Sequence, residues 1–156
     1  MKYIELFAGC GGLSVGLESL KYEMVFANEL SPMAGETFAY NLLKEDLRHL
    51  ADNKKSASKV KWISSQYASN ELASRLRENP QNYPKFMSAT SELGDHLDDL
   101  YGKLIVGSIV ELNRYLTSNK NVFVDLQDQN IDLVSGGPPC QSFSLAGLRQ
   151  HDNNRN

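Results

Sequence analysis

One cysteine of the chain stands in a setting that favours chemistry over packing. Cys140 ends the run Gly136-Gly137-Pro138-Pro139-Cys140, in which two glycines and two prolines predict a stiff, exposed turn. A thiolate is the best nucleophile that a side chain offers. A buried structural cysteine is the usual alternative for any single cysteine. The turn favours a nucleophile instead.

Two other kinds of cysteine chemistry lack support. His49, His96 and His151 show no dyad spacing with Cys140, so the sequence does not indicate a cysteine–histidine hydrolase. The cysteines and histidines are not clustered at metal-ligand spacing. We therefore expect no metal site.

A second constellation pairs a glycine-rich turn at 7–12 with an acidic residue. The turn is not a dinucleotide fingerprint, because that pattern requires a glycine where Ser14 stands. Its backbone can nevertheless approach a ligand closely, and the helix that follows presents amide donors to an anionic group. Glu29, 20 residues after Gly9, can accept hydrogen bonds from ribose hydroxyls. A plain turn with an exposed glutamate is the alternative; together the two features predict a nucleoside ligand with a carboxylate, such as S-adenosylmethionine.

These residues follow the ends of predicted strands. Short apolar runs that predict strands alternate with patterns that predict helices, one of which opens with the cap-and-proline signal Ser31-Pro32. The strands are expected at 3–7, 24–27, 103–106 and 131–135, and the helices at 13–20, 32–43 and 109–116. This alternation predicts an α/β fold with a mostly parallel sheet and helices on both faces. Ligands of such sheets bind beyond the carboxyl ends of the strands, where all the clusters lie.

The stretch from 44 to about 102 differs in composition from the rest. It is rich in Lys, Ser, Asn and Glu, and it is too long for an ordinary connection. We expect a polar, partly helical insertion at the sheet edge, with one helix at 71–77, and we expect no chemistry from it. The 156 residues are otherwise expected to form one domain.

Composition limits the class of protein and the compartment in which we expect it. Hydrophobic residues make up 41% and charged residues 22%, no apolar run is long enough to span a bilayer, and no export leader is recognisable. We expect a cytoplasmic, prokaryotic protein with no membrane partner. Proteins that bind nucleic acid usually have a basic surface, whereas the net charge of this chain is −3. Any contact with nucleic acid should therefore be local.

Three motifs resemble those of the cytosine-5 DNA methyltransferases. They are Glu-Leu-Phe-Ala-Gly-Cys-Gly-Gly-Leu-Ser at 5–14, Ala-Asn-Glu-Leu-Ser at 27–31, and Gly-Gly-Pro-Pro-Cys-Gln-Ser-Phe-Ser at 136–144, in the family's order. The resemblance covers residues 1–43 and about 103–156 and leaves the stretch between them unmatched. It implies a Rossmann-like, S-adenosylmethionine-dependent methyltransferase fold, here incomplete.

The resemblance also implies a mechanism. The Cys140 thiolate would attack carbon 6 of a cytosine that has left the duplex, and carbon 5 would then take the methyl group of S-adenosylmethionine. Methyltransferases that modify exocyclic amines carry an aromatic residue after Pro-Pro, so a cysteine at that place favours the carbon-5 reaction.

Cofactor contacts follow from the same resemblance. Phe7 and Leu30 would lie against the adenine, Glu29 would hold the ribose, and Pro139 would touch the cofactor near its sulfur. The methionine part would contact Gly9, Gly12 and Leu13, and the pocket would be completed by Ala8, Gly11, Ser108 and Ile109. The family often has aspartate where Ser108 stands, so the contact of that residue with adenine would be weakened or replaced.

DNA contacts are expected in the loop from Gln141 to Arg155. Gln141, Ser144, Arg149 and Arg155 are the candidates, with solvated arginines as the alternative for the last two.

The family's Glu-Asn-Val segment does not occur after Cys140, and no target-recognition region is recognisable. We therefore expect the chain to be the N-terminal part of a catalytic domain and to be inactive alone. It would belong to a bacterial restriction-modification methylase, with a second polypeptide as one source of the missing motifs. A tRNA cytosine-5 methyltransferase and a non-catalytic S-adenosylmethionine-binding subunit remain alternatives.

Overall fold

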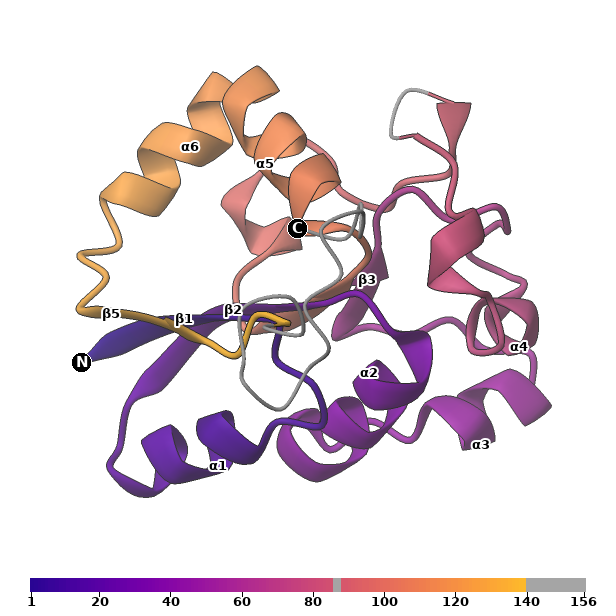
Figure 1. The fold of residues 1–156 in the computed structure, drawn as a ribbon, viewed down its shortest axis with the longest axis horizontal. Coiled ribbons are helices and arrows are strands. Elements are labelled where there is room, and N and C mark those ends of the chain that lie inside the picture. Colours follow the sequence, from indigo (N-terminus) through magenta and orange to yellow (C-terminus); the bar gives the residue numbers. More distant parts are fainter. Residues whose placement is uncertain (86–87, 140–156) are drawn as a thin grey trace, which may run out of the picture.

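Five parallel strands form one open sheet in the computed structural model, which describes residues 1–85 and 88–139 (Figure 1). The strands are β1 (Lys2–Leu6), β2 (Glu23–Glu29), β3 (Val60–Trp62), β4 (Lys103–Val106) and β5 (Leu133–Gly136). Their order across the sheet is β3-β4-β2-β1-β5, and every pairing is parallel. After β4 the chain thus returns to the far side of β1, which makes the boundary between β1 and β5 a topological switch point.

Helices cover both faces of the sheet. The α-helices are α1 (Gly12–Ser19), α2 (Pro32–Phe38), α3 (Leu47–Asp52), α4 (Leu72–Arg75), α5 (Ile109–Ser118) and α6 (Lys120–Gln127), and α2 continues into a π-helical turn, η1 (Ala39–Leu43). The described residues also include the 3-10 turns η2 (Pro80–Asn82) and η4 (Leu97–Asp99). In Figure 1, α1, α2 and α3 lie below the sheet and α5 and α6 lie above it. The expected α/β, Rossmann-like architecture is confirmed.

Two apolar clusters sandwich the sheet. One contains Phe38 and Leu43 from the α2 side. The other contains Leu112 and Val122 from α5 and α6. Successive strand residues supply opposite faces: in β4, Leu104 belongs to the first cluster and Ile105 to the second. This double burial explains why the central strands read as continuous apolar runs.

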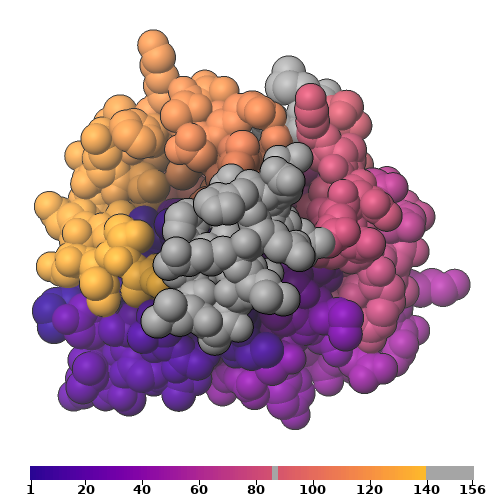
Figure 2. Space-filling view, viewed as in Figure 1, coloured from indigo at the N-terminus to yellow at the C-terminus, as the bar shows by residue number. Residues whose placement is uncertain are grey.

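The polar stretch 44–102 contributes more to the fold than its composition suggests. It contains β3, which pairs with β4 as an edge strand and was not predicted. Trp62 and Ile63 are fully buried there, and Leu72 and Leu76 join the core below the sheet. The space-filling view shows the pink atoms of residues around 70–100 and the yellow atoms of β5 on opposite sides of one face (Figure 2). The stretch lies at the sheet edge and contains a helix, as expected, but β3 and these buried side chains also make much of it part of the core.

Helix α1 buries a serine, while several of the apolar residues at 13–20 are exposed. Leu13, Val15 and Leu20 are 48%, 53% and 69% exposed, whereas Ser14 is fully buried. The Ser14 hydroxyl donates a hydrogen bond to the buried carboxyl group of Glu5 on β1. The helix thus docks through a polar pair, and a hydrogen-bonded serine needs less space between helix and strand than a leucine.

Strands β1 and β5 approach so closely that only glycine fits at one position. A Cβ atom added to Gly136 would lie 2.2 Å from the backbone oxygen of Leu6. At its neighbour Gly137, no atom of the described residues lies within 4 Å of the corresponding position. This contact fixes where β5 ends and where the Pro138-Pro139 turn begins.

We predict that Gly136→Ala lowers the free energy of unfolding by about 1–3 kcal/mol, the usual range for overpacking in a well-packed region. The measurement is urea denaturation. Gly137→Ala is the matched control and should change the value by less than about 0.5 kcal/mol. Equal losses in the two variants would refute the close approach as the reason for glycine at 136.

Burial raises the pKa of the Glu5 carboxyl above its ordinary value of 4.5, although the Ser14 hydrogen bond acts in the opposite direction. Protonated Glu5 therefore favours the folded state. The stability from this group is complete below pH 4.5 and is lost as the pH rises through the raised pKa. Glu5→Gln removes this titration, so we predict that the variant gains stability relative to wild type as the pH rises. Denaturation at a series of pH values tests this, and a difference in free energy of unfolding between Glu5→Gln and wild type that does not change with pH would contradict it. Glu18→Gln, at an exposed position on α1, is the control.

Candidate functional site

The carboxyl ends of the strands surround a cavity of about 500 Å³. This volume lies within the range of about 300–1,000 Å³ typical of small-molecule sites. The turns after β1, β2, β4 and β5 all contribute to it, and so does one residue of the 44–102 stretch. The lining residues are Phe7, Gly9, Asn28, Glu29, Leu30, Ser31, Pro80, Ser108, Ile109, Gly137 and Pro139. The cavity lies where an α/β sheet of this topology binds its ligands.

The turn after β1 carries unusual backbone geometry. Phe7 has a φ of 55°, a left-handed conformation that is rare for a bulky side chain and that typically marks functional sites. Gly11 also has a positive φ, and a Cβ atom there would lie 2.3 Å from Leu42 and 2.9 Å from Phe38. Ala8 N donates to Asn28 O at 2.9 Å. The turn is therefore held against β2 and α2, and the Phe7 side chain lies in the cavity wall.

Glu29 joins the turns around the cavity. Its carboxylate accepts hydrogen bonds from Gly9 N at 2.7 Å and from Ser31 N at 2.8 Å. Its backbone oxygen accepts from Gly107 N, after β4, at 2.9 Å. One residue thus connects the turns after three strands. Each carboxylate oxygen has a second lone pair, so Glu29 can still accept hydrogen bonds from a ligand.

Asn28 holds the turn after β4 in place. Its buried side-chain amide donates to the backbone oxygens of Ile105 at 2.9 Å and of Gly107 at 3.1 Å. Ser108 then caps α5, because its hydroxyl accepts from Val110 N at 3.2 Å. The serine that stands where the family often has aspartate therefore has a structural role, and it also lines the cavity.

The structure brings together most, but not all, of the residues expected to bind a cofactor. Those that line the cavity are Phe7, Gly9, Glu29, Leu30, Ser108, Ile109 and Pro139. Ala8 is buried, Gly11 packs under α2, and Gly12 and Leu13 begin α1 with exposed surfaces. These four residues shape the turn without lining the cavity.

Four lining residues were missed. Asn28, Ser31 and Gly137 are direct neighbours of predicted residues, so their place in the motifs could have indicated them. Pro80 lies 49 residues after Ser31 in sequence, and no sequence pattern pointed to it.

Several expected site residues lie outside the described part of the chain. They are the proposed nucleophile Cys140 and the proposed DNA contacts Gln141, Ser144, Arg149 and Arg155. Within residues 1–85 and 88–139, no group of three or more His, Cys, Asp or Glu side chains could hold a metal ion. None of the helices in this same part is long and apolar enough to cross a membrane. Cys10 is an exposed free thiol.

A family model described as C-5 cytosine-specific DNA methylase matches residues 1–66 and 87–156. The match extends further into the 44–102 stretch than the motifs indicated and leaves only 67–86 uncovered. No solved structure matches the chain.

Individual relatives agree with the family match. The chain is 30% identical over 142 residues to DNA (cytosine-5)-methyltransferase 3 of Arabidopsis thaliana and 28% identical over 153 residues to the type II methyltransferase M.XorII of Xanthomonas oryzae. These alignments cover 90% and 98% of the chain but 8% and 22% of the relatives. A shorter match, 39% over 54 residues, covers 32% of the chain and 16% of the type II methyltransferase M.FnuDI of Fusobacterium nucleatum. The chain thus spans less than a quarter of the length of each of these relatives.

We predict that Glu29→Gln lowers the free energy of unfolding by about 1–3 kcal/mol, because a glutamine NH2 group would face one of the two backbone donors and leave it unsatisfied. Urea denaturation without ligand measures the loss. Glu18→Gln is the same change at an exposed position and should be nearly neutral. If both variants matched wild type, Glu29 would not be the residue that joins the turns.

Proposed function

The chain belongs to the C-5 cytosine-specific DNA methylase family, and from this premise we propose that it carries the cofactor site and the nucleophile of an enzyme that methylates carbon 5 of cytosine in DNA. One observation carries the proposal most directly. The cavity that Glu29 organises is lined by Pro139, and Pro139 immediately precedes Cys140 in the sequence. This neighbourhood supports a nucleoside site beside a cysteine nucleophile.

The cavity suits S-adenosylmethionine. Phe7, Leu30 and Ile109 offer apolar surface for an adenine, and the Glu29 carboxylate offers acceptors for ribose hydroxyls. Gly9 and Pro139 line the remaining wall and are assigned to the methionine part and to the neighbourhood of the sulfur. Ala8, Gly11, Gly12 and Leu13 support the turn, and Ser108 replaces the family's aspartate beside the adenine. When bound, the cofactor supplies the methyl group.

Cys140 makes the target carbon reactive. Carbon 5 of cytosine is a poor nucleophile, and addition of the thiolate to carbon 6 turns the ring into an enamine whose carbon 5 can accept a methyl group. Loss of the carbon-5 proton and elimination of the thiol then restore the aromatic ring. The base must leave the duplex for this attack, at a cost of about a few kcal/mol.

DNA is proposed as the substrate because the family description and the names of the relatives specify DNA methylation. Gln141, Ser144, Arg149 and Arg155 are proposed to contact it. With a net charge of −3, the chain offers no general basic surplus, so these contacts are expected to be local.

We further propose that the enzyme is the modification partner of a bacterial restriction nuclease and works in the cytoplasm. Two relatives from bacteria are named type II methyltransferases, which supports this assignment. The isolated 156 residues are proposed to lack turnover because no Glu-Asn-Val segment follows Cys140 within them. A second polypeptide is one way to supply such a segment.

We predict that DNA containing 5-fluorocytosine forms a covalent complex with the intact enzyme through Cys140, since fluorine at carbon 5 blocks the proton loss that precedes release of the thiol. The measurement is a protein–DNA band that survives denaturing electrophoresis in the presence of S-adenosylmethionine. Cys140→Ser should abolish the band. Cys10→Ser, the same change at the exposed second cysteine, should retain it. A full-strength band in Cys140→Ser would overturn the nucleophile assignment.

A further inference from the structure

One wall of the cofactor cavity comes from the part of the chain that the family model leaves unmatched. The unmatched stretch is 67–86, and within it Pro80 lines the cavity. Pro80 is half-buried and is the first residue of the turn η2. A proline ring on a fixed turn is a rigid apolar surface. The same cavity is lined by Leu30 and Ser31 from the turn after β2.

Glu78 holds this turn in place. Glu78 is buried, and its carboxylate accepts hydrogen bonds from the Ser65 hydroxyl and from Gln66 N, both at 2.7 Å. The Gln66 side chain donates in turn to Asn82 O at 2.9 Å. The turn that carries Pro80 is thus tied on both sides to the chain just after β3, which is part of the sheet.

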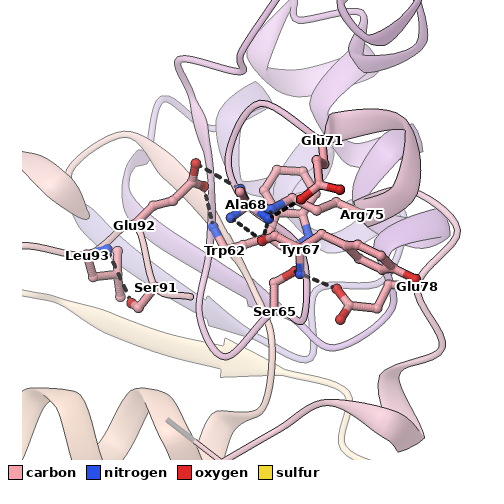
Figure 3. Close-up of polar contacts among 10 residues, drawn as sticks. All are labelled: Trp62, Ser65, Tyr67, Ala68, Glu71, Arg75, Glu78, Ser91, Glu92 and Leu93. Atoms are coloured by element: carbon pink, nitrogen blue, oxygen red, sulfur yellow. Dashed lines mark hydrogen bonds and ion pairs between the residues drawn. The ribbon is translucent and has the colours of Figure 1, made fainter. Parts of the chain in front are cut away.

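A buried arginine fixes the helix that leads into the turn. The Arg75 guanidinium, 1% exposed, lies 2.8 Å from a Glu92 carboxylate oxygen and donates to Tyr67 O at 3.0 and 3.1 Å (Figure 3). It also lies 5.3 Å from the ring centroid of Trp62. Figure 3 shows Arg75 and Glu78 on adjoining parts of this network, with Glu78 directed at Ser65. Such a network is costly to build and rigid once it is fully paired.

Tyr83 ends the turn η2 that begins with Pro80. Burial raises the pKa of the Tyr83 hydroxyl, the charges of Glu78 and Glu29 raise it further, and Arg75 lowers it. The hydroxyl oxygen is buried and has no hydrogen-bond partner among the described residues. Pro80 shares the cavity with Glu29, the residue assigned to the ribose, and with Leu30, assigned to the adenine. This shared lining supports a contact of Pro80 with the nucleoside part.

We propose that Pro80 is a cofactor-contacting residue that packs against the nucleoside part of S-adenosylmethionine, and that Glu78 is the positioning residue that holds it there. Pro80 then adds to the pocket a contact from the stretch that the family model leaves unmatched. This inference rests on the proposed function, because it assigns a contact to the cofactor named there.

The test compares the binding of two ligands to the intact protein by calorimetry. S-adenosylhomocysteine contains both the nucleoside and the amino-acid part, whereas 5′-deoxy-5′-methylthioadenosine lacks the amino-acid part. Pro80→Ala should raise the Kd of both ligands by the same factor, about fourfold for each methylene group removed from contact. Pro84→Ala is the matched control: Pro84 is half-buried, lies four residues further on, and does not line the cavity. It should leave both Kd values unchanged.

A double-mutant cycle tests the role of Glu78. Glu78→Gln keeps one acceptor oxygen and should weaken binding less than Glu78→Ala. If Glu78 acts through Pro80, either change at 78 adds little to the loss already seen in Pro80→Ala. Additive losses would mean that Glu78 has only a general structural role. Should Glu78→Ala fail to fold, the Glu78→Gln cycle gives the same decision.

Failure of the inference and failure of the proposed function give different results. If the wild-type protein binds neither ligand, the cofactor assignment itself is wrong. If wild type binds both ligands and Pro80→Ala matches Pro84→Ala, the cofactor assignment stands and the Pro80 contact is refuted. A loss in Pro80→Ala that is confined to S-adenosylhomocysteine would also overturn the contact with the nucleoside part.

Discussion

The Glu29 carboxylate is the interaction on which the geometry of the site depends. It accepts one backbone hydrogen bond from the turn after β1 and one from the turn after β2, and the backbone of the same residue receives a third from the turn after β4. Parallel strands alone bring their carboxyl ends to one edge of the sheet, but they do not fix the loops that follow. Because one residue holds three loops, the cavity has its shape before any ligand binds. The remaining lone pairs of the Glu29 carboxylate stay available for ribose hydroxyls.

Close backbone packing completes this arrangement around the turns. Gly11 lies beneath Phe38 and Leu42, and Gly136 lies against the backbone of Leu6. The first contact is possible only because Gly11 has no side chain. The second brings β5, and with it the Pro138-Pro139 turn, to the switch point beside β1. The second contact thereby helps to position Pro139, which lines the cavity.

The sequence carried enough information for the central strands and for most of the cavity. Strands β1, β2 and β4 have apolar centres because both faces of the sheet are covered there, whereas β5 is only partly buried. The glycine-rich turn follows β1 directly, and Glu29 ends β2. Strand β3 was not predicted, because it has only three residues and lies in a polar stretch. The place of Pro80 in the cavity was not predicted, because it depends on the hydrogen bonds of Glu78 with Ser65 and Gln66. No local sequence pattern encodes these bonds. The apolar residues at 13–20 predicted the helix, but they did not indicate that its buried residue is Ser14, which pairs with Glu5.

The most direct test of the central claim, that the cavity organised by Glu29 holds S-adenosylmethionine, is a crystal structure of the protein with S-adenosylhomocysteine. The account predicts the ribose hydroxyls on the Glu29 carboxylate, the adenine among Phe7, Leu30 and Ile109, and the hydrogen bonds from Gly9 N and Ser31 N still in place. A ligand whose ribose lies away from Glu29, or which binds outside this cavity, would contradict it.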